Sequence, residues 1–177
     1  LQSMTLDVTD NWLPSVDSGL NLRLAAEEMR RGELRYVVDV KNGMEVFRSG
    51  AAYFRKQHER HRTLVADDAE RALWTSLGKE GERYIGLVEA HFGETGGNME
   101  SRGNFAVQKS FPLYDTVIHT ADKLVEHNHK GAAGARERAV RSGDSARWIM
   151  IGLNLGAIVI GALFALVIAR SIVRPLG

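Results

Sequence analysis

Apolar residues recur at helical spacing through most of the chain. Between residues 44 and 65, apolar side chains and two histidines follow a strict alternation of three and four residues, and a second such row runs from 73 to 91. This spacing places the row on one side of an α-helix, as in the seam of a helical bundle. Breaks around Asn42-Gly43, at 65–68 and at 92–98 separate four helical segments.

The connections at the first two breaks are short, so consecutive helices must be antiparallel neighbours. The sequence therefore predicts an all-α protein, an up-down-up-down antiparallel four-helix bundle. We expect the fourth helix to begin at about Pro112, because proline is favoured at the first position of a helix, and to continue into the C-terminal segment.

The C-terminal segment Trp148 to Ala169 has 22 residues, no charge and a single polar amide, Asn154. A helix of that length reaches roughly 33 Å, enough to cross the hydrocarbon core of a bilayer. A buried core helix is the alternative, but a soluble core rarely needs a helix that is apolar around its whole circumference. We predict a sensor domain at 1–147, a transmembrane helix at 148–169 and the start of a linker at 170–177.

The composition of the chain excludes several classes of function. The 177 residues carry a formal net charge of +1, so no single-sign field attracts nucleic acid. Cysteine is absent, which excludes disulfides, cysteine-ligated zinc and thiol catalysis. The chain opens "LQSMTLDVTDNW" without an initiator methionine, and we expect it to be a piece of a longer protein.

The first helix carries two apolar rows instead of one. At 100° per residue, one row lies within about 40° and the other lies nearly opposite. The first row consists of Leu13, Leu20, Leu24, Arg31 and Val38, and the second of Leu22, Met29 and Tyr36. Only one row can face the core of a small bundle, so the other suggests a homodimer packed along this helix; a broad core face is the alternative.

Two arginines of this helix, Arg31 and Arg35, lie four residues apart in "MRRGELRYVVD" and are therefore neighbours that repel. Local pairs with Glu27 and Asp39, each four residues away, would satisfy both charges. The other interpretation is a bound anion, since the planar guanidinium suits a carboxylate.

Histidines and acids give little support for catalysis. His58 and His61 share a helix face, which is half of a metal site, but solvated or seam-lining histidines explain them equally well. Glu126 and His129 have the spacing of one half of a di-iron bundle, and no second Glu-x-x-His occurs. A phosphate loop or a Ser-His-Asp arrangement does not stand out. We predict no enzyme, no metal and no cofactor.

The predicted chain is one helical bundle whose last helix runs into a membrane span and then into "RSIVRPLG" at 170–177. This arrangement resembles the periplasmic four-helix-bundle sensor module of bacterial methyl-accepting chemotaxis receptors, and "RSIVRPLG" resembles the start of a HAMP linker. The stretches "NWLPSV" at 11–16, "MRRGELRYVV" at 29–38 and "AERAL" at 69–73 are similar to stretches of proteobacterial members. The resemblance covers nearly the whole chain.

The resemblance implies a homodimer along the first helix, higher-order receptor arrays, and a place in the bacterial inner membrane with the bundle in the periplasm. It also implies that Arg31 and Arg35 bind ligand and that Asp39 matches the acid following them. Where the aspartate receptor of this family has a third arginine, this chain has Ala26. By position, Arg30, Tyr114 and Thr116 replace the missing ligand groups.

The expected function is recognition of a small organic anion, signalled by displacement of the fourth helix to a cytoplasmic HAMP and signalling module. Di- or tricarboxylates such as malate or citrate come first, aromatic acids second and amino acids third. The alternatives are the same module on a histidine kinase or cyclase, and sensing through a metal or a periplasmic binding protein.

Overall fold

The computed structural model describes residues 12–93 and 98–173; in the last helix, the side chains at 142–144, 146, 159 and 161–173 are outside the description. The described residues form helices and connecting turns without any strand. The elements in chain order are α2 (Leu13–Val37), α3 (Gly43–His61), α4 (Asp68–Gly93), α5 (Met99–Phe105), the π-helical segment η2 (Ala106–Ser110) and α6 (Phe111–Val173). The predicted all-α class is confirmed.

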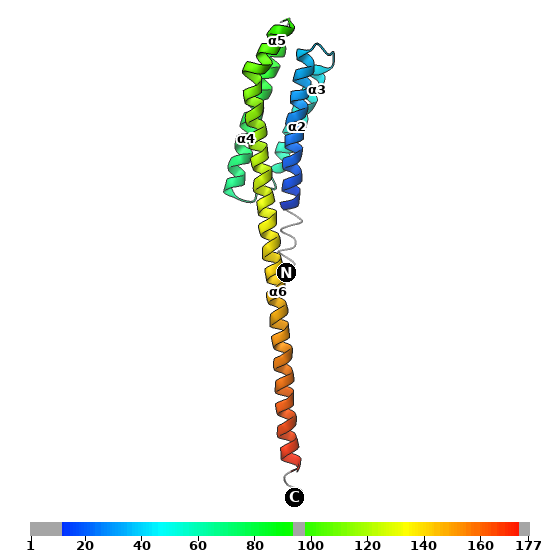
Figure 1. Cartoon of the computed structure of the whole chain (residues 1–177), viewed down its shortest axis with the longest axis vertical. Coiled ribbons are helices and arrows are strands. Elements are labelled where there is room, and N and C mark those ends of the chain that lie inside the picture. Colours follow the sequence, from blue (N-terminus) through cyan, green and yellow to red (C-terminus); the bar gives the residue numbers. More distant parts are fainter. Residues whose placement is uncertain (1–11, 94–97, 174–177) are drawn as a thin grey trace.

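Four long helices lie side by side in the bundle (Figure 1). The chain rises through α2, descends through α3, rises through α4 to α5, and descends again through α6. Helix α6 leaves the bundle at its lower end and continues alone. The turns at 38–42 and 62–67 coincide with the predicted breaks, which is what short polar connections between antiparallel helices require.

Helices α2 and α3 make the most extensive contact, and α6 packs against both α4 and α2. Glycines explain how closely α2 and α3 approach. A Cβ atom added to Gly32 would lie 2.2 Å from the backbone nitrogen of Phe47, and one added to Gly50 would lie 2.8 Å from that of Met29. Any larger residue at either position would force the two backbones apart.

Asp67 caps the N-terminus of α4. Its Oδ1 accepts a hydrogen bond of 2.8 Å from the backbone N–H of Glu70, and Glu70 Oε2 accepts one of 2.6 Å from the N–H of Ala66. This reciprocal pair satisfies donors that a helix start leaves unpaired. It explains why α4 begins at Asp68, the last residue of "VADD".

The expectation that the fourth helix begins at Pro112 is wrong. The chain is already helical from Met99, and η2 precedes α6 without a break in the helical path. In η2 the backbone N–H of Phe111 donates to Ala106 O, five residues back, so the helix is locally wider. Proline lacks the N–H that an interior helical position normally uses, and one wide turn just before it accommodates this irregularity.

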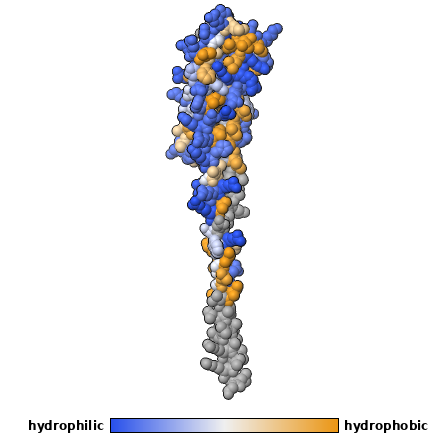
Figure 2. All heavy atoms as spheres, viewed as in Figure 1, coloured by the Kyte–Doolittle hydropathy of each residue, from blue (hydrophilic) through white to orange (hydrophobic). Residues whose placement is uncertain are grey.

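Figure 2 shows apolar side chains along α6 below the bundle, and Trp148, Ile149 and Leu153 are among the exposed ones. Among the residues whose side chains are described, no helix is long and apolar enough to cross a membrane. The predicted span at 148–169 lies within α6, but its side chains at 159 and 161–169 are outside the description, as are residues 174–177 of the predicted linker. The transmembrane helix stays a prediction.

Candidate functional site

The two apolar rows of α2 differ in burial. Leu22 and Met29 of the second row are fully buried, and Tyr36 packs against the same core. In the first row Leu24 is 54% exposed, and Leu13, Leu20 and Val38 are exposed as well. The core therefore uses the second row, and the first row remains an apolar stripe on the outside of α2.

Arg31 and Arg35 belong to this exposed side of the bundle. Arg31 keeps 62% of its side chain accessible and pairs with Glu28, Nη1 to Oε2 at 2.7 Å. Arg35 Nη1 donates to Asn42 Oδ1 at 3.3 Å. Exposed pairs of this kind contribute little to stability, so both guanidinium groups stay available to a stronger anionic partner.

The local pairs expected for these arginines are wrong. Glu27 pairs with Arg23 at 3.2 Å instead, and Asp39 Oδ1 lies 3.2 Å from Arg102 Nη1. Asp39 has a φ of 63°, a left-handed conformation that ends the helical path before residue 39. An i to i+4 pair with Arg35 would have required the helix to continue.

Arg30 lies deeper, against the π-helical segment. Its Nη1 is 2.7 Å from Glu33 Oε2 and donates to Ser110 Oγ at 3.1 Å, while its Nη2 donates to Ala106 O at 3.3 Å. These contacts occupy the guanidinium with protein acceptors. Arg30 therefore holds η2 against α2, and its role in ligand binding stays a prediction.

Glu33 is the centre of a buried polar network. Its carboxylate is 1% exposed and accepts hydrogen bonds from the Tyr84 hydroxyl at 2.7 Å and from the Ser110 hydroxyl, in addition to the Arg30 pair. Burial first, and then the negative charge of Glu33, raise the pKa of Tyr84. The network joins α2, α4 and η2 at the upper half of the bundle.

Tyr114 contributes to the same cluster. The guanidinium carbon of Arg30 lies 5.5 Å from the ring centroids of both Tyr114 and Phe111, within the range of cation–π attraction. Burial first, and then the charge of Glu27, raise the pKa of Tyr114. The structure thus brings two predicted site residues, Arg30 and Tyr114, together.

Thr116 lies elsewhere. Its hydroxyl donates to Pro112 O at 2.8 Å, and its exposed side chain lines a hollow with Asp115, His119 and Lys123. The five predicted site residues therefore occupy three places: Arg31 and Arg35 on the outer side of α2, Arg30 and Tyr114 at η2, and Thr116 on α6.

Sequence reasoning missed Glu33, Tyr84 and Ser110. A signal existed only for Glu33, which follows the buried Met29 by four residues and therefore shares its side of the helix. A carboxylate on a core-facing side must find partners. The partners themselves lie 51 and 77 residues further along the chain, beyond the reach of spacing arguments.

The histidines of α3 line the seam. His58 stacks on Trp74 with ring centroids 4.6 Å apart, and its Nε2 donates to Trp74 O at 2.9 Å. His61 is fully buried and lies 3.0 Å from Glu70 Oε1. Among the described residues, no group of three or more histidines and carboxylates could hold a metal ion.

Glu70 is the second fully buried carboxylate, at the lower end of the bundle. Burial raises its pKa, but the hydrogen bonds from His61 and from the Ala66 N–H, together with the charge of His61, outweigh burial and leave the pKa below the ordinary value for glutamate. The ionised form of Glu70 is therefore favoured in the folded protein.

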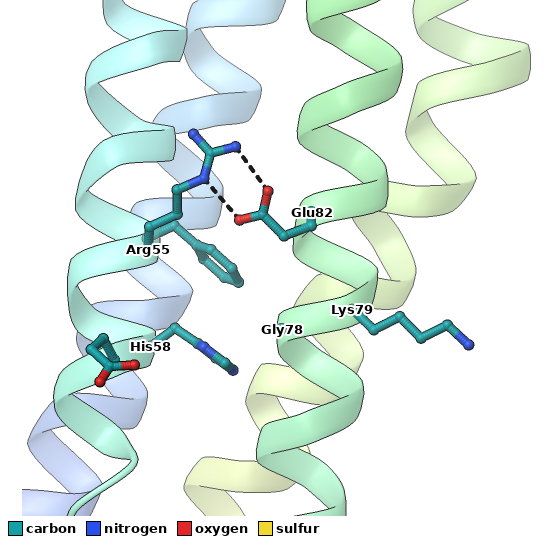
Figure 3. A pocket seen from close by; sticks show the side chains of 7 residues that line it. Arg55, His58, Gly78, Lys79 and Glu82 are labelled. Carbon is teal, nitrogen blue, oxygen red and sulfur yellow. Dashed lines mark hydrogen bonds and ion pairs between the residues drawn. The ribbon is translucent and has the colours of Figure 1, made fainter.

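A hollow of about 310 Å³ separates α3 and α4. Figure 3 shows Arg55 reaching across it to Glu82, with two hydrogen bonds of 2.8 Å, while Lys79 points away. Gly78 leaves room for the His58 ring, since a Cβ there would lie 2.4 Å from its Nε2. Arg55 is therefore already paired with a carboxylate and is not free to bind an anion in this hollow.

No family model matches this chain, and the same holds for the curated proteins and the solved structures with which it was compared. The resemblance to chemotaxis receptors therefore stays a prediction.

Proposed function

We propose that this chain is the sensory region of a membrane-anchored bacterial receptor that binds a small organic anion, with a di- or tricarboxylate as the first candidate. One observation supports it most: the exposed apolar stripe of α2 includes Arg31, between Leu24 and Val38, with 62% of its side chain exposed. An apolar stripe of this length on a monomer indicates a protein partner, and an arginine within it needs an acceptor once the stripe is covered.

The partner that fits is a second copy of the chain, as the resemblance to chemotaxis receptors implies. Two α2 helices packed along this stripe would bring the Arg31 and Arg35 groups of both copies close together. Four guanidinium groups in one interface repel each other, and a di- or tricarboxylate would neutralise them with charge-assisted, bidentate hydrogen bonds.

Contacts between α2 and the last helix provide a route for a signal. Arg23 of α2 is 2.8 Å from Asp122 of α6. Arg30, next to Arg31 in the chain, holds the carbonyl of Ala106 in η2. If α2 and α6 can adopt two relative positions, a ligand that binds one of them more tightly shifts the equilibrium between the two positions by that difference in affinity. Helix displacements of about 1–2 Å are common in such switches.

The test uses the whole chain in detergent micelles and measures thermal stability with malate, citrate, benzoate, amino acids and divalent metals. We expect a di- or tricarboxylate to raise the melting temperature, because a ligand bound only to the folded state stabilises it. The double variant Arg31→Ala, Arg35→Ala should lose this response.

The matched control is Arg48→Ala, Arg60→Ala, which removes two exposed arginines from α3 and should keep the response. The arginine site is wrong if no carboxylate stabilises the chain, or if stabilisation is equal in the two double variants.

A further inference from the structure

A second hollow, about 520 Å³ in volume, lies where α4 meets η2 and the start of α6. We call it the α4–η2 groove, and its lining consists of Arg83, Leu87, Gln108, Lys109, Pro112 and Leu113. The volume falls within the range of small-molecule sites.

The charges of this groove are all positive. No carboxylate lines it, and within the described part of the chain neither Arg83 nor Lys109 makes an ion pair. Glu80 precedes Arg83 by one helical turn, but its Oε1 accepts from Ser76 and its Oε2 accepts from Thr120, both at 2.8 Å. Two cations therefore face the groove without a neutralising partner.

The rest of the lining is mainly apolar. Leu87 and Leu113 are half-buried and line the groove together with Pro112. The other hollows differ in this respect: Arg55 is paired with Glu82 in one, and Glu80 and Asp115 line the other. Of these three hollows, only the α4–η2 groove has two cations in its lining and no carboxylate.

We propose that the α4–η2 groove binds a small aromatic carboxylate. Arg83 and Lys109 hold the carboxylate from α4 and η2, the Gln108 amide donates a further hydrogen bond, and the ring packs on Leu87 and Leu113. The pairing of a bidentate guanidinium with an ammonium suits a single carboxylate. The proposal adds a ligand site to the sensor function but does not depend on the arginines of α2.

The position of the groove gives such a ligand an effect on α6. Lys109 belongs to the π-helical segment, whose wide turn ends where Phe111 N–H bonds Ala106 O. A carboxylate held by both Arg83 and Lys109 ties this turn to α4. Wide π turns are frequent at functional sites, and a ligand that favours this register over a regular α-helix would shift the start of α6 along its axis.

Titration calorimetry on the whole chain in detergent micelles, with benzoate as the probe and benzamide as its neutral analogue, tests the proposal. We expect benzoate to bind. Benzamide should bind about tenfold more weakly or not at all, because it lacks the negative charge that Arg83 and Lys109 bind; a tenfold difference corresponds to about 1.4 kcal/mol. The variant Arg83→Gln, Lys109→Gln should weaken benzoate binding by about tenfold or more. The control Arg48→Gln, Lys56→Gln removes the same two charges from α3 and should bind as the parent does.

Methyl spectra of Leu87 and Leu113 report the place of binding independently of affinity. Shifts of these two methyl groups on addition of benzoate support the groove. The proposal is overturned if benzoate does not bind, or if the Arg83→Gln, Lys109→Gln variant binds it normally. It is also overturned if the Arg31→Ala, Arg35→Ala variant loses benzoate binding while the Arg83→Gln, Lys109→Gln variant keeps it. That last result would leave the proposed function intact, whereas a parent chain that malate and citrate fail to stabilise would overturn only the α2 site.

Discussion

Two buried carboxylates stabilise opposite ends of this bundle in different ways. Glu33, in the upper half, receives hydrogen bonds from Tyr84 and Ser110, which lie 51 and 77 residues away, and pairs with Arg30. Glu70, at the lower end, is held by His61 and Ala66, only nine and four residues away. The first carboxylate connects three elements of the fold, and the second closes one turn.

The chemistry of the partners differs as well. Glu33 faces a guanidinium, since Arg30 Nη1 lies 2.7 Å from its Oε2. Glu70 instead faces an imidazole, with His61 Nε2 3.0 Å from its Oε1, and its own pKa is lowered in the folded protein. The comparison teaches that the upper network determines how α2, α4 and η2 pack, whereas the lower one makes the α3–α4 turn sensitive to acid.

The largest effect is expected for Glu33→Ala. The change leaves the Arg30 charge partly uncompensated and the buried Tyr84 hydroxyl without its acceptor, which should lower the free energy of unfolding by about 3–5 kcal/mol. Urea denaturation followed by circular dichroism measures this loss. The control Glu28→Ala removes an exposed partner of Arg31 and should cost less than about 1 kcal/mol. Equal losses for the two variants would refute the structural role of Glu33.

A smaller and more local effect is expected for Glu70→Gln. The amide keeps the shape but loses the charge that His61 and the Ala66 N–H stabilise, which should cost about 2 kcal/mol. Hydrogen exchange should become faster at 62–67, while the amides around Ser110 keep their protection. Loss of protection at both ends would mean that the two networks act as one unit.

Acid should act at the lower end first. Because the pKa of Glu70 lies below its ordinary value of 4.5, its contribution to stability is fully present above about pH 4.5 and is lost as the pH falls through the folded-state value. The pKa of Asp67 is lowered too, chiefly by the Glu70 N–H, against the opposing effect of burial and with help from His127. Urea midpoints from pH 7 to pH 3 should therefore fall more steeply for the parent than for Glu70→Gln. Parallel curves would contradict this assignment.

The smallest effect is expected for Tyr84→Phe, which removes one donor from Glu33 and leaves Arg30 and Ser110. A loss of about 1 kcal/mol follows from the typical net value of one hydrogen bond. Since the pKa of Tyr84 is raised above its ordinary value of 10.0, this contribution is present below pH 10 and is lost progressively as the pH rises beyond it. Urea denaturation at pH 7 and pH 9 should give the same difference between parent and variant. A loss of stability as large as that of Glu33→Ala would mean that Tyr84, and not Glu33, is the residue on which the network depends.

Apolar spacing and breaker residues alone determined the helical class, the turns after α2 and α3, and the presence of two apolar rows on α2. These are local properties, because a periodicity of 3.6 residues and a helix cap involve only near neighbours in the chain. The same local reasoning failed at Pro112, where a wide turn replaced a helix start, and at Arg35 and Asp39, where a left-handed residue intervened.

Only the tertiary structure decided which row of α2 faces the core, that Arg30 binds η2 while Arg31 stays outside, and that Arg83 and Lys109 line the same groove. Each of these facts depends on residues that are distant in sequence and are brought together by the packing of α2, α4 and η2. Glu33 shows the reason most clearly: the sequence places a carboxylate on the buried side of a helix, but its partners exist only once the bundle has formed.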